Sequence, residues 1–467
     1  MRWSFLPLIA AALAGWATAL SSTGTRLLVV LEEESKQSQY SSLWAQLKSR
    51  GYDLSFESPK SDKLSLFRLG ERAYDHVILL PPAGKAYGPA LSPKILLDFI
   101  NSEGNILLGL TADHPTPAAI SSLLLELDIH ISPDRQAVVV DHFNYDSSSA
   151  SEKHDVLVVP TPKSLRTDLK NFFAGKLPIA FPRAVGQTLG NDSPLLAPIL
   201  RASPNAYVYN PKEETETVED LYASGEQIAL VSALQARNSA RLTVLGSVEA
   251  LEDKWFDAVV EVNGRTSKTQ NSEFAKQLTA WTFKEVGVLK VGRVQHHLKS
   301  GSDGVLNESL YPAGDLNPKI YRVKNDVTFT IELSEYSNDR LIPFTPDAND
   351  VVQLEFSMLS PFHRLRLEPS GTTANSTFFS TSFTLPDQHG IFNFRVNYKR
   401  PFLSNVDEKR EVTVRHFAHD EWPRSWNISG AWTWIAGIWV TVAGWLAFVA
   451  VWLWSAPAKQ TGIKKTQ

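Results

Sequence analysis

Residues 26–31 read Arg26-Leu-Leu-Val-Val-Leu31, an apolar run bounded by charge. Such a short run is typical of a buried strand. The next segment, 35–50, carries bulky apolar residues at helical spacing, and Gly51 would end that helix. Its expected inward-facing residues are Tyr40, Leu43, Trp44 and Leu47. This stretch therefore predicts a strand followed by a helix, the repeating unit of an α/β fold.

The alternation continues up to about residue 132. The further expected strands are 52–57, 76–80 and 105–110, and the expected helices are 93–102 and 117–127. Strands that alternate with helices predict a doubly wound, mostly parallel sheet.

Residues 133–224 are less regular, because prolines interrupt the pattern repeatedly. The acidic run 213–220 is most simply a solvated loop. The α/β pattern then resumes. Strands are expected at 227–233 and 240–246, and a helix at 271–286. We therefore expect one α/β domain over 20–287, with an irregular, proline-rich insertion at about 133–224.

After residue 288 the pattern changes to short alternating stretches that are separated by Asn, Asp, Pro and Gly. The stretches are 321–323, 327–333, 351–356, 377–383, 391–398 and 411–416. Even spacing without a helical period predicts an antiparallel β-sandwich over 288–424.

The segment 431–454 is strongly apolar, and no Asp, Glu, Lys, Arg or His occurs from Ser425 to Ala458. As a helix it would be about 36 Å long, enough to cross the roughly 30 Å hydrocarbon core of a bilayer with some tilt. Tryptophans at both ends match an interfacial aromatic belt. The tail 455–467 holds lysines and no acid, so the positive-inside rule predicts a single transmembrane helix with a cytosolic C-terminus.

The N-terminal segment 1–19 has the pattern of a secretory signal peptide. Arg2 supplies a positive charge, 5–16 is apolar but short for a span, and Ala17-Thr18-Ala19 offers small residues for cleavage. The chain is therefore expected to be a type I membrane protein whose region 20–424 is luminal. It has no cysteine, which excludes disulfides and thiol chemistry. Its net charge of −4, without a long basic run, argues against nucleic acid as a partner.

Short motifs predict where the chain is localised and how it is modified. Lys464 and Lys465 stand fourth and third from the C-terminus, the position of a dilysine retrieval signal of the endoplasmic reticulum. Ordinary stop-transfer charge is the alternative. Among four Asn-x-Ser/Thr sequons, Asn307 and Asn375 are the better candidate glycan acceptors.

Three glycines in and beside the apolar segment, Gly430, Gly437 and Gly444, recur every seven residues and would fall close to one helix face. Small residues let another helix approach closely, so this face is a candidate helix-packing surface. The alternative is the ordinary glycine content of membrane helices.

Catalytic motifs are scarce: no phosphate-binding loop, no dinucleotide-binding turn and no nucleophile elbow occurs. The polar segment Asp141-His-Phe-Asn-Tyr-Asp146 follows the apolar run 137–140. It would lie at the carboxyl end of a strand, where α/β sheets bind ligands. Its candidate contact residues are Asp141, His142, Asn144 and Asp146. A polar turn that packs against a neighbouring domain explains the segment equally well.

Several stretches resemble one family, the type I subunit of the endoplasmic-reticulum oligosaccharyltransferase, known in fungi as the wheat-germ-agglutinin-binding-protein subunit. They are 141–146, 232–241 running into 242–247, 352–356 and 385–398. Gln235-Ala-Arg-Asn238 is a distinctive part of them. The order of the stretches, the single membrane helix and the dilysine tail also fit.

The resemblance implies a non-catalytic subunit of the enzyme that transfers a preassembled oligosaccharide from dolichyl diphosphate to Asn in Asn-x-Ser/Thr. Catalysis would belong to a different, polytopic subunit, so no catalytic residue, cofactor or metal is expected here. The implied partners are that catalytic subunit, a ribophorin-II-type subunit and small membrane subunits. A luminal cargo receptor or chaperone-like binder fits the topology equally well. A stand-alone glycosidase or transferase would need paired carboxylates in a cleft.

Overall fold

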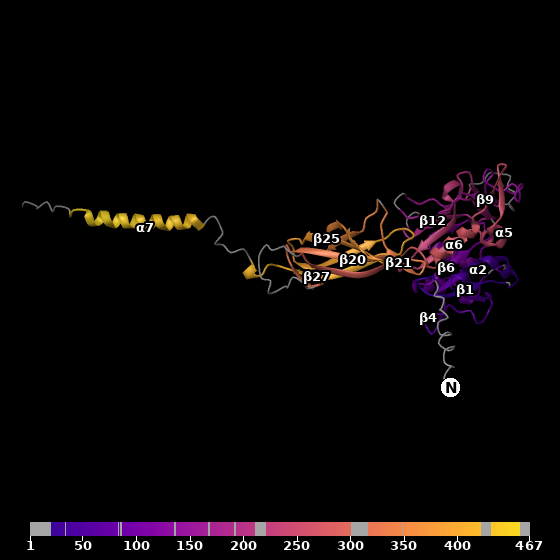
Figure 1. The fold of residues 1–467 in the computed structure, drawn as a ribbon, viewed down its shortest axis with the longest axis horizontal. Coiled ribbons are helices and arrows are strands. Elements are labelled where there is room, and N and C mark those ends of the chain that lie inside the picture. The colour runs from indigo at the N-terminus through magenta and orange to yellow at the C-terminus, as the bar shows by residue number, and fades with distance from the viewer. Residues whose placement is uncertain are drawn as a thin grey trace, which may run out of the picture.

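The structure is a computed structural model in which two folded parts are followed along the chain by a long helix (Figure 1). It describes residues 20–457 apart from 33, 83, 85, 135–136, 167–168, 191–192, 211–220, 300–315, 348 and 422–430. The predicted signal peptide 1–19 and most of the predicted cytosolic tail lie outside the described residues, so both remain predictions.

The first folded part is an α/β domain built on one large sheet. Within the described residues this sheet has nine strands in the order β2-β1-β5-β6-β15-β14-β11-β7, with β12 paired to β14. The parallel strands are β1 Arg26–Val30, β2 Asp53–Glu57, β5 His76–Leu79, β6 Asn105–Gly109 and β15 Arg241–Leu245. The antiparallel strands are β7 Ile129–Ile131, β11 Gln187–Leu189, β12 Leu196–Arg201 and β14 Ala229–Gln235.

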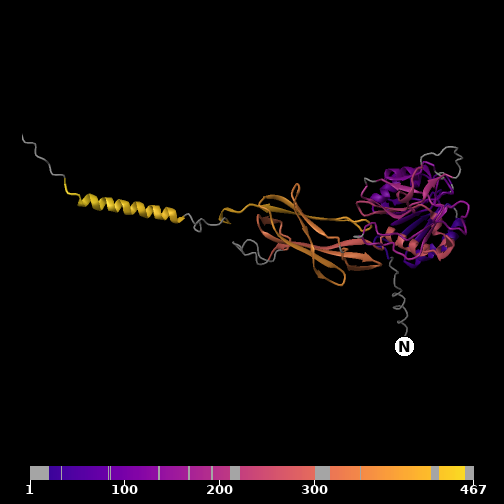
Figure 2. The same cartoon turned by 90° about the horizontal axis from the view of Figure 1, so that it is seen from above.

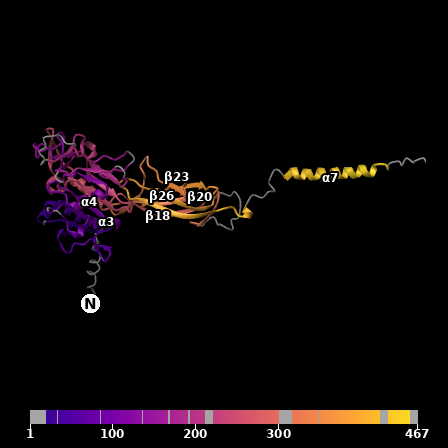
Figure 3. The ribbon, with the colours of Figure 1, turned by 180° about the vertical axis from the view of Figure 1, so that it is seen from behind.

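Helices cover both faces of the sheet, as a doubly wound fold requires. Helices α2 (Ser41–Ser49) and α6 (Asn271–Thr282) pack on one face (Figure 1), and α3 (Pro93–Asn101) and α4 (Ala118–Glu126) on the other (Figure 3). Alternate residues of the inner parallel strands β1, β5, β6 and β15 enter the two cores, so these strands are mostly apolar. The short helix α5 (Asp253–Phe256) contacts α2 and α6. The 3-10 turns are η2 Glu34–Tyr40, η3 Pro89–Leu91, η4 Gly225–Gln227 and η5 Val248–Leu251.

The sheet is less parallel than predicted, because antiparallel strands extend it beyond β15. The turn 236–240 joins β14 directly to β15, and so short a connection can only link antiparallel neighbours. Strands β11 and β12 then both pair with β14. The α/β class is confirmed, as a mixed sheet with a parallel half.

The irregular segment 133–224 contributes short strand pairs beside the main sheet. The pairs in and near it are β8 Val138–Val140 with β13 Tyr207–Tyr209, β9 Val156–Val159 with β10 Ile179–Pro182, and β16 Val259–Val262 with β17 Arg265–Lys268. Trp255 and Val260 pack on β9 and β10 in a small separate core. A further small pair is β3 Phe67–Arg68 with β4 Glu71–Arg72.

The second folded part is the predicted β-sandwich, which follows the α/β domain (Figure 2). One sheet contains β18 Val288–Leu298, β20 Asp326–Ser337, β21 Arg340–Pro343, β24 Glu368–Thr372 and β25 Thr377–Thr384. The other contains β19 Ile320–Arg322, β22 Gln353–Ser357, β23 Pro361–Arg366, β26 Gly390–Tyr398 and β27 Val406–Arg415. All described pairs are antiparallel except β19 with β27. The core between the sheets combines phenylalanine rings with valine and leucine side chains.

After β27 the turn η6 (His419–Glu421) is followed, beyond 422–430, by helix α7 (Ala431–Trp454). The bounds of α7 are those of the predicted transmembrane segment. Among the described residues, α7 is the helix long and apolar enough to cross a membrane, and none of it is buried against the rest of the chain.

Candidate functional site

The polar segment 141–146 follows β8, but β8 pairs with β13 and does not belong to the main sheet. The expectation that this segment occupies the ligand-binding edge of the α/β sheet is therefore wrong. Asp141 is fully buried, and its Oδ1 accepts hydrogen bonds from the backbone N–H groups of Phe143 (2.8 Å) and Asn144 (3.1 Å). The Asn144 side chain donates to Oδ2 at 3.0 Å. Asp141 thus closes its own turn.

Asp146 closes the other end of the segment. Its carboxylate accepts hydrogen bonds from the N–H of Glu261 (2.8 Å) and from the Oγ of Ser148 and Ser149. Burial alone would raise the pKa of Asp146, but these donors outweigh burial and lower it. The bond to Glu261 ties the segment to β16, so this acid has a structural role.

The exposed side of the segment is aromatic. His142 Nε2 lies 3.0 Å from the Tyr207 hydroxyl, and the His142 ring centroid lies 4.6 Å from that of His154. Tyr145 packs edge-on against His154. Phe143 is 61% exposed. With both acids used to hold the turn, His142 and Phe143 are the side chains left open to a partner.

Ion pairs occupy the carboxyl edge of the parallel strands. After β15, buried Glu249 contacts Arg183 (Nη2–Oε1 2.8 Å), and Arg183 also pairs with Asp113, which follows β6. Burial raises the pKa of Glu249, and Arg183 only partly offsets that effect. After β1, Glu32 accepts a hydrogen bond from Lys60 Nζ at 3.0 Å. Over the described part of the chain, no group of three or more His, Asp or Glu is placed to hold a metal ion.

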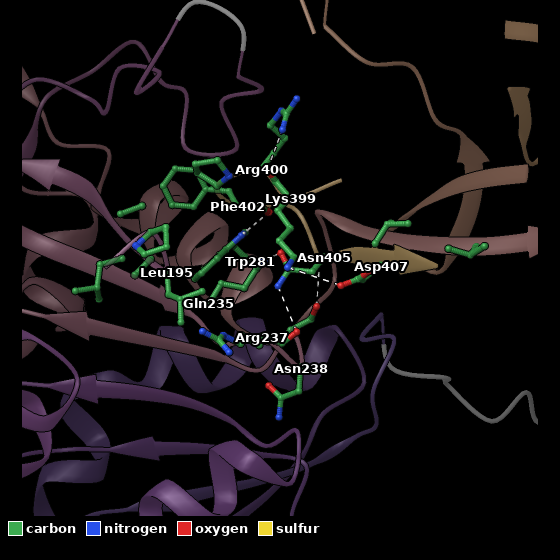
Figure 4. Close-up of a pocket in the computed structure, with 18 of the residues that line it drawn as sticks. Leu195, Gln235, Arg237, Asn238, Trp281, Lys399, Arg400, Phe402, Asn405 and Asp407 are labelled. Atoms are coloured by element: carbon green, nitrogen blue, oxygen red, sulfur yellow. Dashed lines mark hydrogen bonds and ion pairs between the residues drawn. The ribbon is translucent and has the colours of Figure 1, made fainter. Parts of the chain in front are cut away.

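A cleft of about 960 Å³ lies where the α/β domain meets the sandwich (Figure 4). One wall is the β14–β15 hairpin, including residues 235–239. The other is the segment 399–408, which follows β26 and includes the first residues of β27. The hairpin is formed by the stretch 232–241, one of those that carry the family resemblance. The sequence predicted strands at both ends of this stretch, but not that they form a hairpin or that the hairpin meets the sandwich.

Hydrogen bonds join the two walls of the cleft. Gln235 Nε2 donates to the carbonyl of Leu403 (2.5 Å), and Trp281 Nε1 donates to that of Phe402 (2.9 Å). The Asn405 amide donates to two backbone carbonyls of the hairpin turn, at 3.3 and 3.4 Å. Each bond reaches across the joint to backbone atoms, so the joint holds a fixed geometry.

Arg241 fixes the same joint from inside the α/β domain. It is fully buried, and its guanidinium donates to the carbonyls of Trp281 (2.5 Å), Val286 (2.8 Å) and Gly287 (2.6 Å). It also lies 4.7 Å from the centroid of the Trp281 ring. Burial lowers the pKa of Arg241 to about 9. Because Gly287 immediately precedes β18, this arginine ties the α/β domain to the start of the sandwich.

Charged side chains on the sandwich wall are paired with one another. Arg395 makes two hydrogen bonds of 2.9 Å to Asp407. Arg400 binds Asp350 (2.5 Å), which also accepts a hydrogen bond from Tyr398 (2.5 Å). Burial raises the pKa of Asp350, but Arg400 and Tyr398 bring it below its usual value. Arg395, Asp407 and Arg400, which line the cleft, thus have their charges paired.

Comparison with known proteins decides the family. Residues 18–285 match the family described as OST48, N-terminal domain, and residues 307–456 match the OST48 middle domain. The chain belongs to the OST48 family. The recognition made from the sequence is thereby confirmed.

OST48-family relatives are similar along most of the chain. The Arabidopsis thaliana dolichyl-diphosphooligosaccharide--protein glycosyltransferase 48 kDa subunit is 32% identical over 408 residues, 86% of this chain and 87% of that protein. The Schizosaccharomyces pombe subunit wbp1 of the same name is 32% identical over 410 residues, 88% of this chain and 87% of that protein. The Danio rerio 48 kDa subunit is 31% identical over 404 residues, 85% of each chain.

The remaining predicted site residues of this OST48-family chain are dispersed. Asn375 is exposed in the turn between β24 and β25. Gly437 and Gly444 lie in α7, where a Cβ added at either would meet nothing within 4 Å. Outside the described residues lie Gly430, Asn307, Lys464 and Lys465. Of these residues, the described ones, Asn375, Gly437 and Gly444, do not line the cleft, and the roles of all of them remain predictions.

Proposed function

We propose that this chain is a non-catalytic subunit of an oligosaccharyltransferase. The observation that carries the proposal is its similarity, over most of its length, to proteins named as subunits of dolichyl-diphosphooligosaccharide--protein glycosyltransferase. The complex would transfer a preassembled oligosaccharide from dolichyl diphosphate to Asn in Asn-x-Ser/Thr. This chain would contribute by holding partner subunits in place.

Four acids of the α/β domain support a structural role. Glu249 and Asp113, at the carboxyl edge of the sheet, are held by Arg183. Asp141 and Asp146 are held by their own turns. Transfer from a lipid diphosphate calls for groups that stabilise charge at the bilayer surface. These four acids are instead committed to holding the fold.

The proposal also covers topology and partners. The chain would be a type I protein of the endoplasmic-reticulum membrane, with 20–424 luminal and α7 spanning the bilayer. Its partners would be the polytopic catalytic subunit, a ribophorin-II-type subunit and small membrane subunits. Gly437 and Gly444 would form the face of α7 that packs on a partner helix. His142 and Phe143, exposed beside the strand pair β8–β13, would contact a luminal partner.

The address and modification motifs complete the proposal. Lys464 and Lys465 would serve as the retrieval signal. Asn375 is supported as a glycan acceptor by its exposed position in a turn, and Asn307 is proposed from its sequon alone.

Co-purification in mild detergent, followed by an activity assay, tests the proposal. We expect a fixed polytopic complex that glycosylates an acceptor peptide from lipid-linked oligosaccharide, and no turnover by the isolated chain supplied with manganese. A changing set of soluble cargo proteins would indicate a cargo receptor. Turnover that persists after removal of trace catalytic subunit would contradict the non-catalytic role.

A paired substitution tests the helix face. Gly437→Leu with Gly444→Leu adds bulk where a partner helix would approach, and it keeps the segment apolar, so insertion should survive. We expect partner subunits to be lost from detergent pull-downs. The matched control is Ala443→Leu with Ala450→Leu. These two positions are also seven residues apart, but they are offset from the glycines by one residue before and six after Gly444 and so lie on a different face of the helix. Equal recovery of partners with both pairs would place the interface elsewhere.

A further inference from the structure

The end of the sandwich farthest from the α/β domain can be identified from strand register. β27 runs away from the joint and ends at Arg415, and Gly390, at the start of β26, pairs with Val414. β22 runs in the same direction as β27, because Ser357 pairs with Asn393 of β26. The β22–β23 turn therefore lies at this far end. We call residues 358–360 and 390–391 the distal tip.

The distal tip presents apolar side chains to the outside. Leu359 is 99% exposed, and Ile391 is 57% exposed. The sulfur of Met358 lies so near Gly390 that a Cβ there would stand 2.7 Å from it. Met358 thus packs back onto β26, while Leu359 projects from the turn. Turn tips are usually polar or glycine-rich, so Leu359 and Ile391, exposed together at one end of the sandwich, form a candidate contact surface.

The chain leaves the sandwich for α7 from this same end. Arg415 makes hydrogen bonds of 2.7 and 2.8 Å to Glu421, which folds the chain back against the end of β27. From Glu421 to Ala431, the first residue of α7, a fully extended chain spans at most about 35 Å. The distal tip therefore lies at the end of the sandwich from which the chain runs on to α7.

Two basic residues lie at the same end of the sandwich as the apolar turn. Lys299, just after β18, and Lys324, which pairs with Asp387 at 2.8 Å, are both exposed at this end. Exposed apolar side chains and cations at the same end of a domain suit a membrane interface, where aliphatic groups enter the acyl boundary and cations lie among the headgroups.

We propose that the distal tip inserts Leu359 into the interfacial layer of the bilayer that α7 crosses. This inference rests on the membrane topology of the proposed function. The sandwich would then be attached to the membrane at two points, helix α7 and the distal tip. Two attachments restrict its tilt relative to the membrane, whereas α7 alone would leave that tilt free. The α/β domain, joined rigidly at the other end, is then held at a set height above the lipid.

The absence of cysteine from the chain allows a direct test. Single variants Leu359→Cys, Leu69→Cys and Ala447→Cys of the full chain each carry one nitroxide, in nanodiscs of phosphatidylcholine and phosphatidylserine. Leu69 is the matched control, because it too is a fully exposed leucine in a turn, between β3 and β4 of the α/β domain. Ala447 reports the middle of α7. The measurement is the ratio of collision with oxygen, which concentrates in lipid, to collision with a water-soluble nickel chelate.

We expect the ratio at position 359 to be severalfold above that at 69 and below that at 447. Equal ratios at 359 and 69 would overturn the proposal. A label at 359 that is immobilised and shielded from both reagents would show a protein contact and would overturn it as well. A low ratio at 447 would instead contradict the membrane topology, so the two failures are distinguishable. Ile391→Cys, beside the tip, should give a value between those of 69 and 359.

Discussion

The α/β domain and the β-sandwich are stabilised by different kinds of buried contact. In the α/β domain, Arg50 and Tyr52 both bind the buried carboxylate of Glu285 at 2.8 Å, just before the chain leaves for the sandwich. In the sandwich, rings stack, as Phe356 does on Phe392 with centroids 4.7 Å apart and planes 3° from parallel. Directional polar contacts specify the geometry of a junction, whereas apolar burial is sufficient to hold two sheets together.

The same polar pattern joins the start of the α/β domain to its end. Ser21 Oγ donates to the carbonyl of Phe283 at 2.7 Å and lies 3.1 Å from His76 Nε2. Burial lowers the pKa of His76 to about 3, so this histidine is neutral at physiological pH. Asn105 contacts its other ring nitrogen at 3.2 Å. Neutral and charged donors alike thus converge on the segment 283–287, which leads into β18.

The largest effect is expected from Glu285→Ala, which would leave Arg50 buried without its carboxylate. We expect the free energy of unfolding to fall by about 3–5 kcal/mol. Urea unfolding of the detergent-solubilised chain, followed by tryptophan fluorescence, measures it. Tyr52→Phe is the control, since it removes one hydrogen bond to the same carboxylate and should cost about 1.5–3 kcal/mol. Equal losses in the two variants would contradict the importance of the charge.

In the sandwich, Phe356→Leu should cost about 1–2 kcal/mol, because it removes the ring stack and leaves a small void. The unfolding midpoint in urea should fall equally at low and high salt, since no charge is involved. Phe143→Leu, at a 61% exposed position, is the control and should shift stability by less than about 0.5 kcal/mol. A strong salt dependence of the Phe356→Leu effect would contradict the distinction between the two regions.

At the joint, Asn405→Ala should cost about 1 kcal/mol by removing its two side-chain hydrogen bonds to the hairpin turn. Hydrogen exchange should rise in 236–240 and 402–405 more than elsewhere, because these bonds join the two walls of the cleft. Asn397→Ala, an exposed position on β26, serves as the control and should leave exchange unchanged. Uniform exchange changes across both domains would argue against a local clamp.

The smallest effect concerns Glu421 beside the distal tip. Its hydrogen bonds from Arg415 lower its pKa to about 2, below the ordinary value of about 4.3. A carboxyl whose pKa is depressed by folding stabilises the folded state above its unfolded pKa, and that stability is lost as the pH falls toward about 2. We therefore expect the protection of the 415–421 backbone amides against hydrogen exchange, relative to an unfolded chain at the same pH, to fall between about pH 4.5 and 2. In the Glu421→Gln variant, the same amides should already be less protected at neutral pH. Their protection should change little further as the pH falls.

Local patterns in the sequence located many elements closely. The expected strand 26–31 is β1, the expected helix 93–102 is α3, and 391–398 is β26, each within one residue at either end. Helix α3 starts where Ser92 accepts a hydrogen bond from Ile95 N–H and a proline follows it, an N-cap that is legible in sequence. β18 was missed, because exposed Lys290 and other polar residues interrupt its apolar alternation. Its pairing with β20 along nearly its whole length defines it.

The sequence by itself determined the fold class, the apolar helix α7 and, through stretches such as 232–241, the family. These follow from apolar periodicity and short motifs, which depend on neighbours along the chain. Only the tertiary structure decided that β8 lies outside the main sheet, that β19 pairs in parallel with β27, and that 235–241 meets 402–405. It also placed Leu359 at the end of the sandwich from which α7 departs. Such contacts join residues that are far apart in sequence. Which residues meet therefore depends on how the strands pair and on where the packed sheets bring backbone donors and acceptors together.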